Sequence, residues 1–217
     1  MLFLLLALTS HPLGAAAVPV QSGAPDVTTP HREDAAQRRQ GTVRVALQTS
    51  AGAIVVELEA ERAPITTANF LSYVDRKRFD GATFYRAVQV GAGFGLIQGG
   101  VRNDPKRALP PIAHEPTTKT GLSHVDGAIS MARNAPGTAS GDFFITVGAT
   151  ASMDANPSQP GDNLGFAAFG RVVDGMNIVR QILTAPTSST EGQGVMKGQM
   201  LAAPVRIISA RREPKAN

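Results

Sequence analysis

The stretch FDGATFYRAVQVGAGFGLIQGG, residues 79–100, places two short apolar runs on either side of a glycine-rich turn. A second stretch, ISMARNAPGTASGDFFITVG, residues 129–148, also carries apolar runs around a polar turn. Short runs separated by Gly, Pro, Asn and Asp are typical of strands in a closed barrel or a sandwich. Arg86, Gln98 and Asp142 stand in these runs without an obvious nucleophile, metal cluster or phosphate loop. Such a set suits a site that binds and polarises a neutral ligand.

The residues around these stretches predict further regular elements. Apolar and polar residues alternate over 43–59 around a glycine-containing turn, which indicates a β-hairpin. Apolar residues recur at three-residue spacing from Pro64 to Val74, which predicts a short amphipathic helix. A second helix is expected over Met176 to Leu183 with Asp174 as its cap. Strands are expected at 83–90, 94–98, 128–132, 143–147, 167–172 and 205–208.

The N-terminal residues differ in composition from the rest. Residues 1–17 combine an apolar run with a small-residue segment, which predicts a signal peptide too short to span a bilayer. Residues 18–40 are rich in Pro, Ser, Thr and Ala and have no apolar periodicity, so a flexible linker is expected. The folded domain is then expected over residues 41–214. These segments favour a periplasmic or otherwise exported protein, or a cytoplasmic one if the leader does not act as a signal.

Composition excludes several classes of function. A chain of 217 residues with 42% hydrophobic content can bury the core of one domain. Its net charge of +4 comes from scattered Lys and Arg, and aromatic residues make up 5%, so nucleic-acid binding is not expected. The absence of cysteine rules out disulfides, thiol catalysis and Cys-ligated zinc. The four histidines show no metal-ligand spacing, so no metal site is predicted.

Two motifs suggest other chemistries but fail in detail. The glycines of 91–95 follow an apolar run as in a dinucleotide-binding loop, yet Leu96 stands where the third glycine belongs and no βαβ unit surrounds them. Ser123, His124 and Asp126 contain the residue types of a hydrolytic triad. Close neighbours in one strand or turn point in different directions, and the chain has no GxSxG motif. A hydrolase is therefore a weak third hypothesis.

A set of motifs in a fixed order carries a family resemblance. The motifs are Asn69-Phe70, Phe79-Asp80-Gly81, Thr83-Phe84-Tyr85-Arg86, Ile97-Gln98-Gly99-Gly100, Pro110-Pro111-Ile112 with Glu115, Ile129-Ser130-Met131-Ala132-Arg133, Phe143-Phe144-Ile145 and the run 169–176. In this order the chain resembles a cyclophilin of the bacterial exported type, a peptidyl-prolyl cis-trans isomerase. The resemblance implies a mainly β fold, a closed antiparallel β-barrel of about eight strands capped by two α-helices. It implies no cofactor, proline-containing polypeptides as clients, and a monomer.

The resemblance also assigns roles to individual residues. Arg86 matches the catalytic arginine and Gln98 the glutamine that orients it and contacts the substrate backbone. Phe144 matches the floor of the proline pocket and Leu96 its wall. Ala132 and Arg133 match the strand whose backbone pairs with the substrate. These roles imply that a fixed guanidinium favours the twisted X-Pro amide, while an apolar pocket holds the proline ring.

Three departures from the family pattern affect the predicted pocket. About four extra residues between Arg86 and Gln98 displace a phenylalanine that usually lines the pocket. Gly95 stands at the position that corresponds to this phenylalanine, and Phe94 is expected to fill its place in the pocket. Asp142 stands where glutamine is usual, and its carboxylate could pair with Arg86 or Arg133. Met153 and Phe166 differ from the usual Leu and His or Tyr but keep the pocket apolar.

Two functions from different classes remain open at this point. The first is an isomerase that accelerates rotation about X-Pro bonds. The alternative is a low-turnover proline-binding chaperone or scaffold module, motivated by Asp142, by the extra residues of the turn and by Ser152, which stands where the family carries Trp or Phe.

Overall fold

The computed structural model describes residues 41–102 and 104–214. The predicted signal peptide, 1–17, and the predicted linker, 18–40, lie outside the described residues, so export stays a prediction. The strands are β1 (Thr42–Thr49), β2 (Gly52–Glu59), β3 (Thr83–Gly91), β4 (Phe94–Gly100), β5 (Ala128–Met131), β6 (Asp142–Val147), β7 (Ala167–Asp174), β8 (Thr187–Ser188) and β9 (Met200–Arg212). The helices are α2 (Pro64–Asp75), α3 (Thr117–Thr120) and α4 (Met176–Leu183), with 3-10 turns η1 (Ala151–Met153) and η2 (Gly194–Met196).

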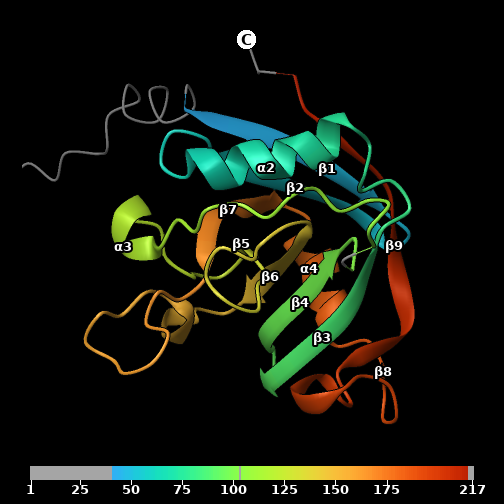
Figure 1. Cartoon of the computed structure of the whole chain (residues 1–217). Coiled ribbons are helices and arrows are strands. Elements are labelled where there is room, and N and C mark those ends of the chain that lie inside the picture. The colour runs from blue at the N-terminus through green and yellow to red at the C-terminus, as the bar shows by residue number, and fades with distance from the viewer. Residues whose placement is uncertain (1–40, 103, 215–217) are drawn as a thin grey trace, which may run out of the picture.

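The strands form one antiparallel sheet whose two ends meet. Their order is β1-β2-β7-β5-β6-β4-β3-β9-β8, and β1 also pairs with β9. Only the two-residue β8 lies outside the closed ring that the described strands form. Figure 1 shows this ring, with the β3–β4 hairpin on its near side and β9 along its right edge. The predicted mainly β fold, a closed eight-stranded antiparallel barrel, is therefore confirmed.

Strand β9 closes the barrel because its two halves have different neighbours. Its beginning pairs with β8 and β3, where Met200 faces Arg86. Its end pairs with β1, where Arg212 faces Val45. Between them the register with β3 shifts, and Pro204 lies in this irregular part, as expected for a residue that cannot donate to a ladder. The expected strand at 205–208 was too short, since the Ala-Ala-Pro sequence before it hides the period-two pattern.

The two longer helices pack against different strands, as predicted. Helix α2 lies against β2, β7 and β9, and α4 lies against β2, β3, β4 and β6. The expected cap of α4 was wrong: Gly175 precedes the helix with a φ of 83°, and the Asp174 carboxylate accepts from the Gly175 N–H instead of an N–H inside the helix. Among the described helices, none is both long and apolar enough to cross a membrane.

The barrel interior is filled by an aromatic cluster that fixes the orientation of β6. Phe70, Phe79 and Phe143 pack with ring centroids 4.9 to 5.4 Å apart and are almost fully buried. Successive side chains of a strand point to opposite faces. Because Phe143 points into the core, its neighbour Phe144 must point to the other face of the sheet, where the predicted site lies.

Candidate active site

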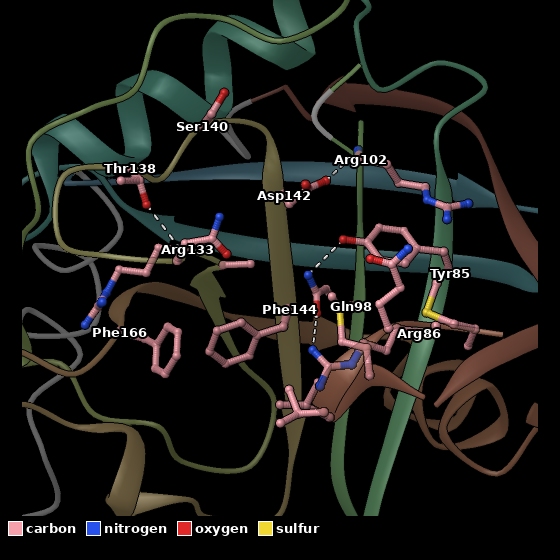
Figure 2. Close-up of a pocket in the computed structure, with 18 of the residues that line it drawn as sticks. Tyr85, Arg86, Gln98, Arg102, Arg133, Thr138, Ser140, Asp142, Phe144 and Phe166 are labelled. Carbon is pink, nitrogen blue, oxygen red and sulfur yellow. Dashed lines mark hydrogen bonds between the residues drawn. The ribbon is translucent and has the colours of Figure 1, made fainter. Parts of the chain in front are cut away.

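An open cavity of about 860 Å³ lies over the face of β3, β4 and β6 that carries Phe144. In Figure 2, Phe144 lies between Phe166 on one side and Gln98 and Arg86 on the other. Except for Phe94, all the predicted site residues line it: Arg86, Leu96, Gln98, Ala132, Arg133, Asp142, Phe144, Met153 and Phe166. Residues far apart in the sequence meet here because β4 pairs with both β3 and β6.

A hydrogen-bonded network fixes the Arg86 side chain. The Arg86 Nη1 donates to Gln98 Oε1 at 2.8 Å, and the Gln98 Nε2 donates to the Tyr85 hydroxyl at 2.8 Å. On the other edge of the guanidinium, Nε and Nη2 donate to Gln199 Oε1 at 2.9 and 2.6 Å. Both partners of Arg86 in this network are neutral amide oxygens, so the guanidinium is held in place while its positive charge is left uncompensated by them.

Burial changes the proton affinities of two members of this network. The half-buried position of Arg86 lowers the pKa of its guanidinium, because burial penalises the charged form. Burial raises the pKa of the Tyr85 hydroxyl, and the negative charge of Asp142 adds to this rise. Tyr85 is therefore a neutral partner of Gln98 over the physiological pH range, and Arg86 is a poorly solvated cation.

Sequence reasoning missed Gln199. It lies directly before β9, in the glycine-rich loop 189–199 that follows β8. This loop has no apolar periodicity, and Gln199 belongs to none of the motifs that carried the resemblance. The one signal that could have pointed to Gln199 was its position just before the last strand. That signal was weak, because the expected strand was too short.

Phe144 forms the floor of the cavity and is held from two sides. It is 3% exposed, and the His124 ring stacks beneath it with centroids 5.8 Å apart and an angle of 12°. Phe166 meets its edge at 5.4 Å and 88°. Leu96 and Met153 add apolar surface to the same cavity. The floor is therefore a fixed, apolar surface of the kind that suits a small ring.

Beneath the floor lies a second, buried polar chain. The His124 Nδ1 lies 2.5 Å from Asp154 Oδ1, and its Nε2 lies 2.9 Å from the Ser130 hydroxyl. Burial lowers the pKa of His124, in spite of the nearby carboxylate. The imidazole is therefore neutral, with Nδ1 donating to Asp154 and Nε2 accepting from Ser130. Burial would raise the pKa of Asp154, but hydrogen bonds from Ser123 and His124 outweigh it and lower that pKa.

This hydrogen-bonded network differs from the triad that the sequence suggested. His124 contacts Asp154 and Ser130, whereas the carboxylate of Asp126 accepts from the Gly148 N–H and the Arg180 guanidinium. The order Asp-His-Ser matches a hydrolytic triad, but Ser130 is fully buried within β5. A substrate cannot reach its hydroxyl, so the chain supports Phe144 from below and is not a nucleophilic centre.

Arg133 lines the cavity, but its side chain is committed to the protein. Its Nη1 donates to Asp162 at 2.5 Å and its Nε donates to the Gly165 carbonyl at 3.0 Å. Its guanidinium lies 5.1 Å from the Phe166 ring centroid. These contacts fix the loop 156–165 and hold Phe166 at the edge of the pocket. The side chain of Arg133 thus stabilises a wall of the cavity.

Asp142 also has a different partner from those expected. Its Oδ1 accepts from the backbone N–H of Arg102 at 2.8 Å, and its carbonyl accepts from the Ala132 N–H at 2.9 Å. Arg102 has a positive φ of 53°, and its guanidinium lies 5.0 Å from the Tyr85 ring centroid. The carboxylate therefore holds the turn after β4, and the expected pairing with Arg86 or Arg133 is replaced by this contact in the described network.

The expectation that Phe94 lines the pocket was wrong. Its ring lies against Gly148, where an added Cβ would come within 2.3 Å of it, one step along the sheet from the cavity. Gly95 cannot supply the missing ring either. Its φ is 153°, and a Cβ there would lie 1.9 Å from the Val88 carbonyl oxygen across the hairpin. Neither Phe94 nor Gly95 is thus among the residues that line the cavity.

The family model "Cyclophilin type peptidyl-prolyl cis-trans isomerase/CLD" matches residues 44–212. A peptidyl-prolyl cis-trans isomerase of Streptomyces antibioticus is 37% identical over 170 residues, which cover 77% of this chain and 96% of that protein. One of Acinetobacter baylyi is 34% identical and covers 77% and 84% of the two chains.

Relatives also occur outside bacteria. A peptidyl-prolyl cis-trans isomerase-like 3 protein of Gallus gallus is 32% identical over 150 residues, covering 66% of this chain and 84% of that protein. Among solved structures, a cyclophilin type peptidyl-prolyl cis-trans isomerase of Cryptosporidium parvum superposes with a TM-score of 0.64 at 20% identity. It covers 81% of this chain and 99% of that chain, which shows a shared fold.

Proposed function

This chain belongs to the cyclophilin-type peptidyl-prolyl cis-trans isomerases, and from that membership we propose that Arg86 accelerates X-Pro rotation by stabilising the twisted amide. The observation that carries the proposal is the position of its guanidinium, fixed by two amide oxygens at the side of an apolar floor. Arginine has five N–H donors, and three take part in the described hydrogen bonds of Arg86. Two donors remain for a ligand in the cavity.

The reaction breaks no covalent bond. Rotation of an X-Pro amide meets a barrier of about 18–20 kcal/mol because it disrupts the amide resonance. In the twisted state the prolyl nitrogen becomes pyramidal, and its lone pair becomes a better hydrogen-bond acceptor. A donor aimed at that nitrogen therefore binds the twisted state more strongly than either planar state, which is the condition for catalysis.

The surroundings of Arg86 strengthen this effect. The guanidinium is half-buried, so its attraction to a lone pair is less screened than it would be in water. It needs no reorientation during the reaction, because Gln98 and Gln199 already hold it. The proline ring would rest on Phe144, beside Phe166, with the prolyl nitrogen turned toward Arg86.

The test is the rate of cis-to-trans conversion of a short X-Pro peptide, measured by NMR exchange without a coupling protease. We expect the Arg86→Ala variant to lower kcat/KM by about 10²- to 10³-fold, the loss typical of removing one positioned donor. The Arg78→Ala variant, which removes an arginine that does not line the cavity, is the matched control for loss of an arginine. Equal rates for wild type and Arg86→Ala would overturn the mechanism while leaving the activity itself in place.

The alternative of a low-turnover binding module loses one of its three supports. That support was the idea that Asp142 would take up the donors of Arg86, whereas the described hydrogen bonds of Arg86 go to two amides. Asp142 instead accepts from the Arg102 N–H. The clients, the proline-containing polypeptides expected from the sequence, are part of the same proposal.

A further inference from the structure

We propose that Gln199 is a positioning residue for Arg86, an inference that rests on the proposed function of that arginine. Its Oε1 accepts from Nε at 2.9 Å and from Nη2 at 2.6 Å, while Gln98 accepts from Nη1. A planar group held at two edges by two side chains cannot rotate about the Cδ–Nε bond without breaking hydrogen bonds. Gln98 alone would hold the group through one hydrogen bond, about which the guanidinium could still tilt, so Gln199 on the opposite edge sets the direction of the remaining donors.

The backbone around Gln199 is anchored to the strand that carries Arg86. The Gln199 carbonyl accepts from the Ala87 N–H at 3.0 Å, and its own N–H donates to the Met196 carbonyl at 3.1 Å. The next residue, Met200, faces Arg86 across the β3–β9 ladder. The backbone of Gln199 is thus fixed to the residue that follows Arg86 on β3, which allows the precision that a positioned donor requires.

The amide chemistry of Gln199 matters as much as its position. A neutral oxygen accepts two hydrogen bonds from the guanidinium but leaves its net charge intact. A carboxylate at the same place would hold the group at least as firmly, but it would form an ion pair and draw the positive charge away from the prolyl nitrogen. Gln199 therefore orients Arg86 without neutralising it, and the two properties can be separated by substitution.

The first experiment compares Gln199→Met with Gln181→Met in the full chain. Methionine keeps the length of the side chain but cannot accept as an amide oxygen does, and Gln181 is an exposed residue of α4 outside the cavity. We expect Gln199→Met to lower kcat by about 10- to 100-fold with little change in KM, because its contact is with Arg86 and not with the substrate. The Gln181→Met variant should match wild type. A wild-type kcat in a folded Gln199→Met variant would overturn the inference.

A double-mutant cycle separates this inference from the proposal beneath it. In the Arg86→Ala background, Gln199→Met should have no further effect on kcat, because its target has been removed. If the Arg86→Ala variant is slow but the fold-losses in kcat of the two substitutions multiply in the double variant, Gln199 acts independently of Arg86 and the positioning role is wrong. If Arg86→Ala retains full activity, the proposed mechanism has failed first.

The Gln199→Glu variant provides a pH readout that a merely structural role would not move, and it serves if Gln199→Met does not fold. With the carboxylate ionised, Arg86 is held but paired, so kcat should be low at neutral pH. As the pH falls and the carboxylate is protonated, the neutral acid becomes an acceptor again and kcat should rise toward the wild-type value. A pH profile parallel to that of wild type would contradict the inference.

Discussion

Two hydrogen-bonded networks surround the pocket, one at its side and one beneath its floor, and they differ in the donors that they leave available to a ligand. Tyr85, Gln98, Arg86 and Gln199 form a network at the side of the cavity, with two guanidinium donors left for a ligand. Beneath Phe144, the chain from Asp154 through His124 to Ser130 uses its donors and acceptors internally. The buried network beneath Phe144 has the residue types most associated with catalysis, whereas the network at the side of the cavity has only an arginine and neutral partners.

The contrast shows that residue types do not identify a catalytic centre on their own. His124 and Ser130 are fully buried, so their hydrogen bonds contribute to stability and to the position of Phe144. Arg86 lines an open cavity and keeps unused donors, so its hydrogen bonds prepare it for a ligand. Substitutions in the two chains should therefore affect different measurements, and three experiments sharpen or break that comparison.

The largest effect is expected from Asp154→Ala. This change leaves the buried His124 Nδ1–H and backbone N–H without their acceptor and should lower the free energy of unfolding by about 2–3 kcal/mol. The value of kcat should change little, because Arg86 is untouched, while KM should rise as Phe144 loosens. Urea unfolding and peptide kinetics measure the two effects. The control is Asp75→Ala, which removes an exposed pair with Arg212 and should cost about 0–1 kcal/mol.

A smaller effect, in the same direction, is expected from pH. The folded pKa of His124 is lowered from 6.5 by burial, so its contribution to stability is complete above pH 6.5 and is lost as the pH falls below it. The lowered pKa of Asp154 has the same sign, with the loss beginning below its ordinary value of 3.8. Stability should therefore fall below pH 6.5, at a rate of at most about 1.4 kcal/mol per pH unit from one group.

The kinetic constants of the folded enzyme should stay flat over this range, since neither Arg86 nor Tyr85 titrates there. Thermal unfolding and peptide exchange at several pH values test both statements, with His124→Gln expected to flatten the stability curve. A kcat that follows the stability curve would show that the two chains are coupled and that the comparison is too simple.

The smallest effect is expected from Asp142→Gln. Glutamine can still accept from the Arg102 N–H through its amide oxygen, and the guanidinium of Arg86 is held by other residues. We expect kcat/KM to be preserved or raised, within about threefold of wild type. A large loss, measured with the same X-Pro peptide, would mean that the carboxylate contributes to orienting the Arg86 network.

The sequence predicted much of the fold because its strongest patterns are local. The hairpin around residues 43–59 and the helix from Pro64 showed clear periodicity, and both are present in β1, β2 and α2. The family motifs led to the residues that now line the cavity, with Phe94 as the exception. Its displacement depends on the path of the longer hairpin, where Gly95 leaves no room for a side chain.

The contacts that sequence reasoning missed are the non-local ones. His124 was compared with its neighbour Asp126, whereas its partner Asp154 directly follows the turn η1, much later in the chain. Gln199 lies 113 residues after Arg86 in the sequence, and the two side chains meet only because β9 pairs with β3. Neither partnership follows from periodicity or spacing, because both depend on where the closing strands bring loops together.

The place of Gln199 directly before β9 has a consequence for folding kinetics. Strand β9 makes the most sequence-distant pairing of the barrel, that of Arg212 with Val45, and such contacts form late because the loop they close is long. The same strand delivers the residue that orients Arg86. A refolding chain should then regain a formed pocket floor before full turnover, so that recovery of activity reports the final step of barrel closure.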